Sequence, residues 1–245
     1  MAFGQGNGGF TAEALALIAR MSPTPNYTRK VVINQLVADL IAGNVWNDLD
    51  VLHVYAADAS GNAVLNFKGS SYGATNSGAT FTADRGFTGD AATAYLSMAY
   101  QPGNGQFGAS DHSFGAWVRT AATINSTSAG ANDGSYFARV HKSTAIDGTL
   151  TDVVSWGTET GLLAVSRQNG TDFTAYRNGA SVVTDAAAFT NPAFSFRVLA
   201  TNSSGTETEF SDAQVSAFFA GKGLDSTKMA ALYTALARYM TSVGA

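Results

Sequence analysis

The chain has 245 residues and a formal net charge of −4, and only 13% of its residues are charged, about half the usual quarter. It contains no cysteine, which excludes a disulfide scaffold and a Cys-ligated zinc site. The Lys and Arg residues are scattered singly, which disfavours nucleic-acid binding. Aromatic residues make up 11% of the chain, which disfavours intrinsic disorder. A chain of this length buries roughly 70–75% of its unfolded surface, enough for one substantial core.

The N-terminal residues carry no recognisable targeting signal. Residues 1–10 read MAFGQGNGGF, without the positive and apolar segments of a signal peptide. No apolar run approaches the 18 residues that a transmembrane helix requires. We therefore expect no signal peptide and no membrane insertion.

Three amphipathic helices are predicted near the ends of the chain. The first spans residues 11–21 with Thr11 as its N-cap, and Ser-Pro-Thr-Pro at 22–25 ends it because proline disfavours helix in the residue before it. The second spans 26–42, where apolar residues recur every three or four positions. The third spans 225–242, with Asp225 or Ser226 as its cap.

Between these helices the apolar pattern has the period of two that is typical of strands. Asn-Gly turns at 169–170 and 178–179 are strong hairpin signals. The predicted strands are 49–56, 63–67, 79–83, 94–100, 113–120, 135–141, 152–157, 161–167, 172–177, 180–184, 194–200 and 214–220. So many short strands without long helices between them indicate a β-sandwich or barrel.

Three motifs in this region carry a resemblance to a known family. They are Ser-Phe-Gly-Ala-Trp-Val-Arg at 113–119, Thr-Ala-Tyr-Arg-Asn-Gly at 174–179, and a closing strand that leads into a helix over 210–236. In order and spacing they resemble the concanavalin A-like jelly roll, specifically its laminin-G-like branch. The resemblance covers roughly residues 79–236 and implies a mainly β fold, a jelly-roll sandwich flanked by N-terminal helices and a C-terminal amphipathic helix. We therefore expect an N-terminal helical anchoring segment over 1–48, a β-sandwich over 49–224, and a helix over 225–245 packed on the sandwich.

Catalytic constellations are sparse. The two G-x-G-x-x-G matches, at 4–9 and 103–108, lack the strand–turn–helix context of a dinucleotide site. The histidines His53, His112 and His141 are far apart and lack metal-binding spacing. Glu207 and Glu209 would share a strand face at the carboxylate separation of a retaining glycosidase, although the preceding Asn-Ser-Ser-Gly favours a loop edge. We therefore expect no catalytic residues and no enzyme.

Ligand binding is the remaining possibility. Sugar sites combine aromatic side chains with polar hydrogen-bonding groups. The candidate ligand-binding residues are Arg139, His141, Trp156, Arg167, Tyr176 and Arg177. We expect no cofactor and no metal, with calcium at the loops Asn132-Asp133-Gly134 and Asp147-Gly148 as the open alternative.

The helix–jelly roll–helix plan and the small-residue composition are similar to those of structural proteins of tailed bacteriophages. The resemblance implies a non-enzymatic virion protein, in a fibre, spike or decoration role on the particle surface, with host-surface glycan as a candidate ligand. Its expected partners are other virion proteins and copies of itself, through the N-terminal helices. A stand-alone lectin-like carbohydrate-binding module or adhesin is the alternative, and a laminarinase-like hydrolase is the third hypothesis.

Overall fold

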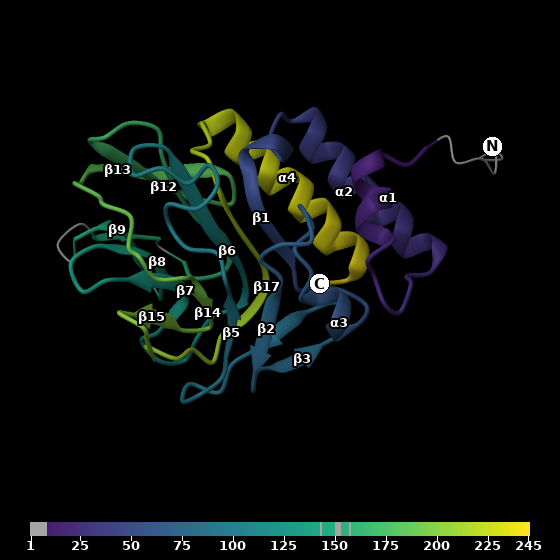
Figure 1. Ribbon diagram of the computed structural model, residues 1–245, viewed down its shortest axis with the longest axis horizontal. Coiled ribbons are helices and arrows are strands. Elements are labelled where there is room, and N and C mark those ends of the chain that lie inside the picture. Colours follow the sequence, from purple (N-terminus) through teal and green to yellow (C-terminus); the bar gives the residue numbers. More distant parts are fainter. Residues whose placement is uncertain (1–8, 143, 150–152, 157) are drawn as a thin grey trace.

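A computed structural model describes residues 9–142, 144–149, 153–156 and 158–245. Its helices are α1 (Ala12–Ile18), α2 (Tyr27–Ala42), α3 (Ser60–Ala63) and α4 (Ser226–Val243), with a short 3-10 helix η1 (Trp46–Asp48). Two curled sheets and a layer of helices make up the fold (Figure 1). None of the described helices is long and apolar enough to cross a membrane.

The first sheet, sheet A, has eight strands in the described residues. Their order is β13-β12-β11-β6-β17-β4-β3, with β1 paired to β17. Their bounds are β1 Leu49–Val54, β3 Thr80–Thr82, β4 Gly86–Thr88, β6 His112–Thr120, β11 Gly161–Arg167, β12 Asp172–Arg177, β13 Ala180–Ala186 and β17 Gln214–Gly221. All pairings in sheet A are antiparallel.

The second sheet, sheet B, has nine strands in the described residues. Their order is β10-β9-β8-β7-β14-β5-β2, and β15 pairs with both β7 and β16. Their bounds are β2 Ala74–Ser77, β5 Tyr95–Met98, β7 Thr127–Asn132, β8 Phe137–His141, β9 Thr144–Gly148, β10 Val153–Ser155, β14 Arg197–Val198, β15 Thr201–Ser203 and β16 Thr206–Thr208. The β15–β7 pairing is parallel, because the chain reverses between β14 and β15 at Leu199, which has a φ of 69°.

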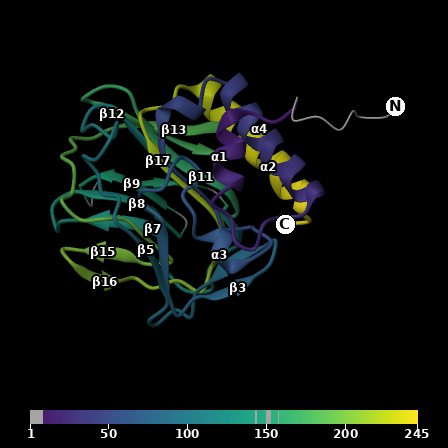
Figure 2. The ribbon, with the colours of Figure 1, turned by 45° about the vertical axis from the view of Figure 1, so that its right-hand side comes forward.

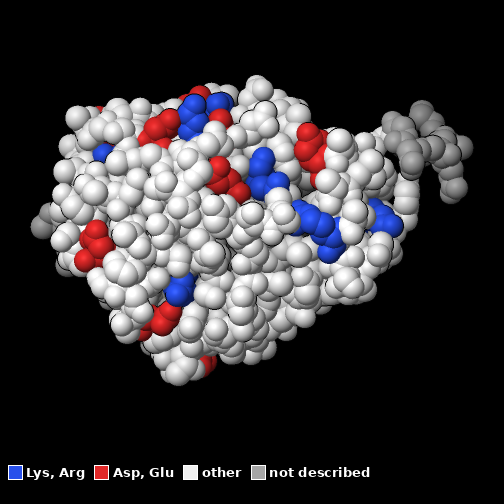
Figure 3. All heavy atoms as spheres, in the orientation of Figure 1, with Lys and Arg blue, Asp and Glu red and all other residues white. Residues whose placement is uncertain are grey.

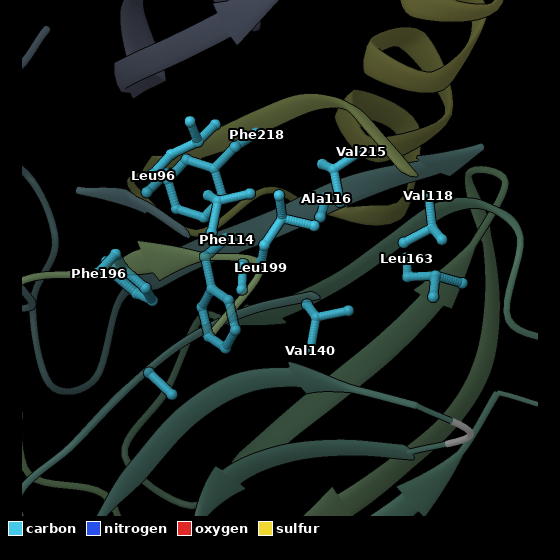
Figure 4. Packing of buried hydrophobic residues seen from close by; sticks show 14 of the residues in the cluster. Leu96, Phe114, Ala116, Val118, Val140, Leu163, Phe196, Leu199, Val215 and Phe218 are labelled. Carbon is cyan, nitrogen blue, oxygen red and sulfur yellow. The ribbon is translucent and has the colours of Figure 1, made fainter. Parts of the chain in front are cut away.

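The main core lies between the two sheets (Figure 4). Alternate residues of each strand point inward, as expected for a sandwich. Sheet A contributes Phe114, Leu163 and Phe218, and sheet B contributes Leu96 and Val140. All five are at most 1% exposed. The fold is thus mainly β, a jelly-roll-type sandwich, as the sequence predicted.

A second core lies between the outer face of sheet A and the helices. Leu36 and Leu40 of α2 pack with Leu232 and Leu236 of α4, over Phe219 of β17. In Figures 1 and 2, α1, α2 and α4 lie together on one side of the molecule, opposite the strands of sheet B. The helices therefore cover sheet A and leave the outer face of sheet B free of helical cover.

Several predicted boundaries agree closely with the structure and others do not. Thr11 caps α1 and Asp225 caps α4, as predicted, and β11 and β12 have the predicted bounds. The predicted strand 63–67 is wrong: α3 ends at Ala63, and Asn66 forms only an isolated bridge. Residues 152 and 157 of the predicted strand 152–157 lie outside the described residues. Strands β2, β4, β7, β9, β15 and β16 were not predicted.

Charged groups are sparse on the surface as well as in the sequence. Figure 3 shows one face on which Lys, Arg, Asp and Glu side chains are scattered among a large excess of uncharged residues. Half of the Lys and Arg residues, seven of fourteen, form ion pairs in the described structure, such as Arg238 with Asp39 and Lys228 with Asp48.

Candidate functional site

The outer face of sheet B places polar side chains in one row across three strands. Arg197 of β14 lies opposite Gly130 of β7, which in turn lies opposite Arg139 of β8. Thr201 of β15 also pairs with Gly130. A Cβ atom on Gly130 would lie 2.9 Å from Cβ of Arg139 and 3.0 Å from Oγ1 of Thr201. Only glycine therefore lets these side chains cross this point of the sheet.

Arg139 and Glu209 form the centre of this face. Nη1 of Arg139 donates to Oε2 of Glu209, and the same oxygen accepts hydrogen bonds from Thr127 Oγ1 at 2.8 Å and Thr201 Oγ1 at 2.9 Å. Burial acts to raise the pKa of Glu209, but the charge of Arg139 and these hydrogen bonds outweigh it and lower the pKa. Glu209 is therefore a stable carboxylate. Its side chain is 34% exposed, and in the described structure its hydrogen bonds all use Oε2.

The arginine that pairs with this carboxylate is itself buried. The side chain of Arg139 is only 8% exposed and its guanidinium lies 5.1 Å from the ring of Phe137. Its Nε is buried and has no hydrogen-bond partner among the described residues. His141, two residues along β8, has a pKa lowered by burial and then by the charge of Arg139. The neutral form of His141 is therefore favoured beside the arginine.

A second ion pair continues the face. Arg197 Nε donates to Glu207 Oε1 at 2.9 Å, and Arg197 Nη1 donates to Ser195 Oγ at 2.8 Å. The Arg197 guanidinium lies 5.7 Å from the ring of Tyr95, which contacts Phe210 at 6.3 Å between ring centroids. Because Tyr95, Arg197 and Glu207 are only partly buried, they offer a surface with planar, polar and charged groups.

Glu207 and Glu209 do not form the paired carboxylates of a strand face. Strand β16 ends at Thr208, and Glu209 has a φ of 53° outside it. Each carboxylate is instead paired with its own arginine. A general acid must hold a proton near neutral pH, which requires a raised pKa, whereas that of Glu209 is lowered.

Of the six residues predicted to bind ligand, only Arg139 and His141 lie on this face. Trp156 is in the main core, where its Nε1 donates to the carbonyl of His141. Arg167 is fully buried and donates to Asp147 through Nε at 3.1 Å. The remaining two, Tyr176 and Arg177, are neighbours on β12.

Tyr176 and Arg177 occupy different environments in spite of their adjacency. Tyr176 belongs to the second core, beneath the helices. Arg177 is half-buried and donates to the carbonyl of Trp156 and to Thr158 Oγ1. The structure therefore does not bring the six residues together into one site.

Functional candidates on this face that the sequence did not single out as binding residues are Tyr95, Thr127, Arg197 and Thr201. Glu207 and Glu209 were singled out, but as candidate catalytic carboxylates. Strand β7 was not predicted from the sequence. Its prediction would have helped to locate the face, because β7 lies between β8 and β14 in the sheet.

No group of three or more His, Asp or Glu residues in the described part of the chain could hold a metal ion. The two loop carboxylates considered for calcium have other partners. Asp133 accepts from the backbone N–H groups of Ser135 and Tyr136. Asp147 is buried with Arg167 and lies 2.9 Å from Nε2 of His112.

No protein-family profile and no curated protein sequence matches the chain. Solved structures do resemble it. Domain 4 of a GH43 extracellular arabinanase from Geobacillus stearothermophilus, in complex with arabinotriose, has a TM-score of 0.52 at 15% identity, covering 76% of this chain and 98% of that domain. A structure described by the interaction of botulinum neurotoxin type C with two ganglioside molecules has a TM-score of 0.53 at 13% identity, covering 80% and 53%.

A mutant of Trypanosoma rangeli sialidase that displays trans-sialidase activity has a TM-score of 0.54 at 12% identity, covering 85% of this chain and 39% of that one. The chain spans about half the length of the botulinum neurotoxin structures it matches. At such low identity, the likeness establishes a shared β-sandwich fold.

Proposed function

We propose that this protein is a non-catalytic carbohydrate-binding protein whose sugar site is the outer face of sheet B. The observation that carries the proposal is the Glu209 carboxylate, which Arg139, Thr127 and Thr201 hold through Oε2, leaving Oε1 without a hydrogen bond from the described residues. A fixed carboxylate beside partly exposed aromatic rings suits a sugar, which presents hydroxyl groups on one side and C–H groups on another.

Two further observations support this proposal. The helices cover the outer face of sheet A but not that of sheet B (Figure 2). Among proteins of similar fold, the arabinanase domain was solved with arabinotriose and the type C neurotoxin structure is described by its ganglioside interaction. The ion pairing of both glutamates favours binding over hydrolysis, because neither is arranged as a general acid.

A glycan array with matched variants tests the sugar site. Glu209→Gln keeps the shape of the side chain but replaces the charged acceptor, and we expect it to weaken binding about tenfold, as for the loss of a charge-assisted hydrogen bond. Arg238→Met is the control, because Arg238 is exposed on α4 and paired with Asp39. Equal binding by wild type and Glu209→Gln, or no sugar binding by the wild type, would contradict the proposal.

We further propose that the protein is a virion component displayed on the particle of a tailed phage, attached through its helical layer. Of the seven exposed large hydrophobic residues in the described part of the chain, four lie on α1 and α2, namely Leu15, Tyr27, Val31 and Ile41. A helix that carries apolar residues on its solvent side as well as its core side is normally covered by another surface. Other virion proteins, or copies of this chain, would provide that cover.

Sedimentation of the purified chain at micromolar concentration tests the attachment through copies of itself. We expect oligomers that dissociate when Val31→Glu places a charge on the exposed side of α2. A wild-type chain that stays strictly monomeric, and is absent from purified phage particles by mass spectrometry, would contradict the virion role while leaving the sugar site intact.

A further inference from the structure

A cavity of about 170 Å³ lies beside α1, on the helical side of the molecule and separate from the proposed sugar site. Its walls come from α1 and from the turn that follows α3. Leu17 and Phe67 supply apolar surface, and Arg20, Lys68 and Glu13 supply the charged groups. Trp46 of η1 closes one side. The cavity therefore joins an apolar wall to two cationic side chains.

Neither cation in this cavity has a carboxylate partner within ion-pair distance in the described structure. Arg20 donates through Nη1 to the carbonyl of Gly69 at 2.7 Å and through Nη2 to that of Asn66 at 2.9 Å. Lys68 donates to the carbonyl of Trp46, and its Nζ lies 3.9 Å from the centroid of that ring. Backbone carbonyls hold these groups in place but carry no formal charge to pair with them.

The acidic groups nearest to Lys68 are committed elsewhere or do not reach it. Asp50 accepts from the hydroxyl of Tyr100 at 2.8 Å and the backbone N–H of Gln106 at 2.7 Å. Asp48 is paired with Lys228. Glu13 lines the cavity but is exposed and makes no ion pair within the described chain.

We propose that this cavity binds a small carboxylate ligand with an apolar group, the carboxylate lying between Arg20 and Lys68 and the apolar group on Leu17 and Phe67. Two half-buried cations favour an anion more strongly than exposed ones, because the screening by water is weaker. Burial lowers the pKa of Lys68 to about 8, even though the charges of Asp50, Glu13 and Asp48 act to raise it. An anion in contact with Lys68 would raise that pKa again, so binding near pH 8 takes up a proton.

The test uses benzoate as the probe and benzamide as its uncharged match, with the Trp46 indole N–H resonance as the reporter. We expect benzoate to shift this resonance saturably and benzamide to leave it unchanged. Lys68→Met and Arg20→Met should each weaken benzoate binding about tenfold or more. Glu13→Gln removes from the cavity a negative charge that repels benzoate, and it should strengthen binding. Arg238→Met is the control and should change nothing, because Arg238 does not line the cavity and is paired with Asp39.

Calorimetry of benzoate binding at pH 8 in two buffers of different ionisation enthalpy supplies a second readout. We expect proton uptake by the wild type and none by Lys68→Met. The proposal is overturned if benzoate produces no saturable shift in the wild type, or if Lys68→Met and Glu13→Gln both bind as the wild type does. Either result would leave Arg20 and Lys68 as purely structural groups, and neither bears on the sugar site of sheet B.

Discussion

Acid should destabilise this protein through His53, a histidine of β1 with no exposed surface. Its Nε2 lies 3.0 Å from the carbonyl oxygen of Tyr72, whereas its Nδ1 is buried and finds no partner at hydrogen-bond geometry among the described residues. The arrangement suits a neutral ring that donates through Nε2. Burial lowers the pKa of His53 from 6.5 to about 4, and the carbonyls of Tyr72 and Leu65 oppose this only in part.

The sign and size of the effect follow from the difference between the folded and unfolded states. The unfolded chain binds a proton at His53 below pH 6.5, and the folded chain does so only near pH 4. The stabilisation is therefore complete above pH 6.5 and is lost as the pH falls from 6.5 to about 4. At about 1.36 kcal/mol per pKa unit, the loss between pH 7.5 and pH 5.0 is about 2 kcal/mol.

Urea unfolding at pH 7.5 and pH 5.0 measures this loss in the wild type and in His53→Gln. Glutamine retains a donor for the carbonyl of Tyr72 but has no group that titrates. The carboxylates contribute equally to both proteins, so their effect cancels in the comparison. We expect the wild type to lose about 2 kcal/mol more than the variant. An equal loss in the two proteins would refute the assignment of His53 as a buried neutral histidine.

Three further substitutions probe the packing and capping of the fold. Asp147→Leu leaves Arg167 buried without its carboxylate and should cost about 3–5 kcal/mol of unfolding free energy, measured by urea titration. Gly115→Ala would place a Cβ 2.6 Å from the carbonyl oxygen of Leu163 and should cost about 1–3 kcal/mol of unfolding free energy. Gly9→Ala is its control and should leave stability unchanged, because no atom of the described chain beyond its immediate neighbours lies within 4 Å of the added Cβ. Asp225→Ala removes the side-chain cap that accepts from the backbone N–H of Lys228, and should lower stability by about 1 kcal/mol; no change in its thermal midpoint would argue against a role for the cap.

The elements that the sequence predicted well are those with local signals. Thr11 and Asp225 are capping residues that precede apolar periodic segments, and the Asn-Gly turn at 178–179 fixes the hairpin of β12 and β13. Strand β7 reads Thr-Ser-Ala-Gly-Ala-Asn, which has little of the β-branched and aromatic character of a typical strand. It lies within sheet B because small residues let Arg139 and Thr201 pack across it, and that requirement comes from other strands.

The candidate site was predictable only in part, because it depends on contacts between residues that are distant in the sequence. Arg139 and Arg167 look alike in the sequence, since both occur in predicted strands. One reaches the outer face of sheet B, and the other points into the interior beside Asp147. Glu209 is 70 residues from Arg139 along the chain, so their pairing depends on the return of β15 and β16 to the sheet. Local pattern carries no information about such a contact.

The position of the chain ends has a practical consequence. Gly9, at the start of the described chain, accepts a hydrogen bond from Asn34 of α2, and Ala245 packs with the helices. Both ends of the described chain therefore lie on the helical side of the molecule (Figure 1). A tag at either end would tether the protein to a sensor surface in the same orientation, with sheet B facing the solution. Immobilised ligand-binding measurements on the two tagged forms should therefore agree with each other.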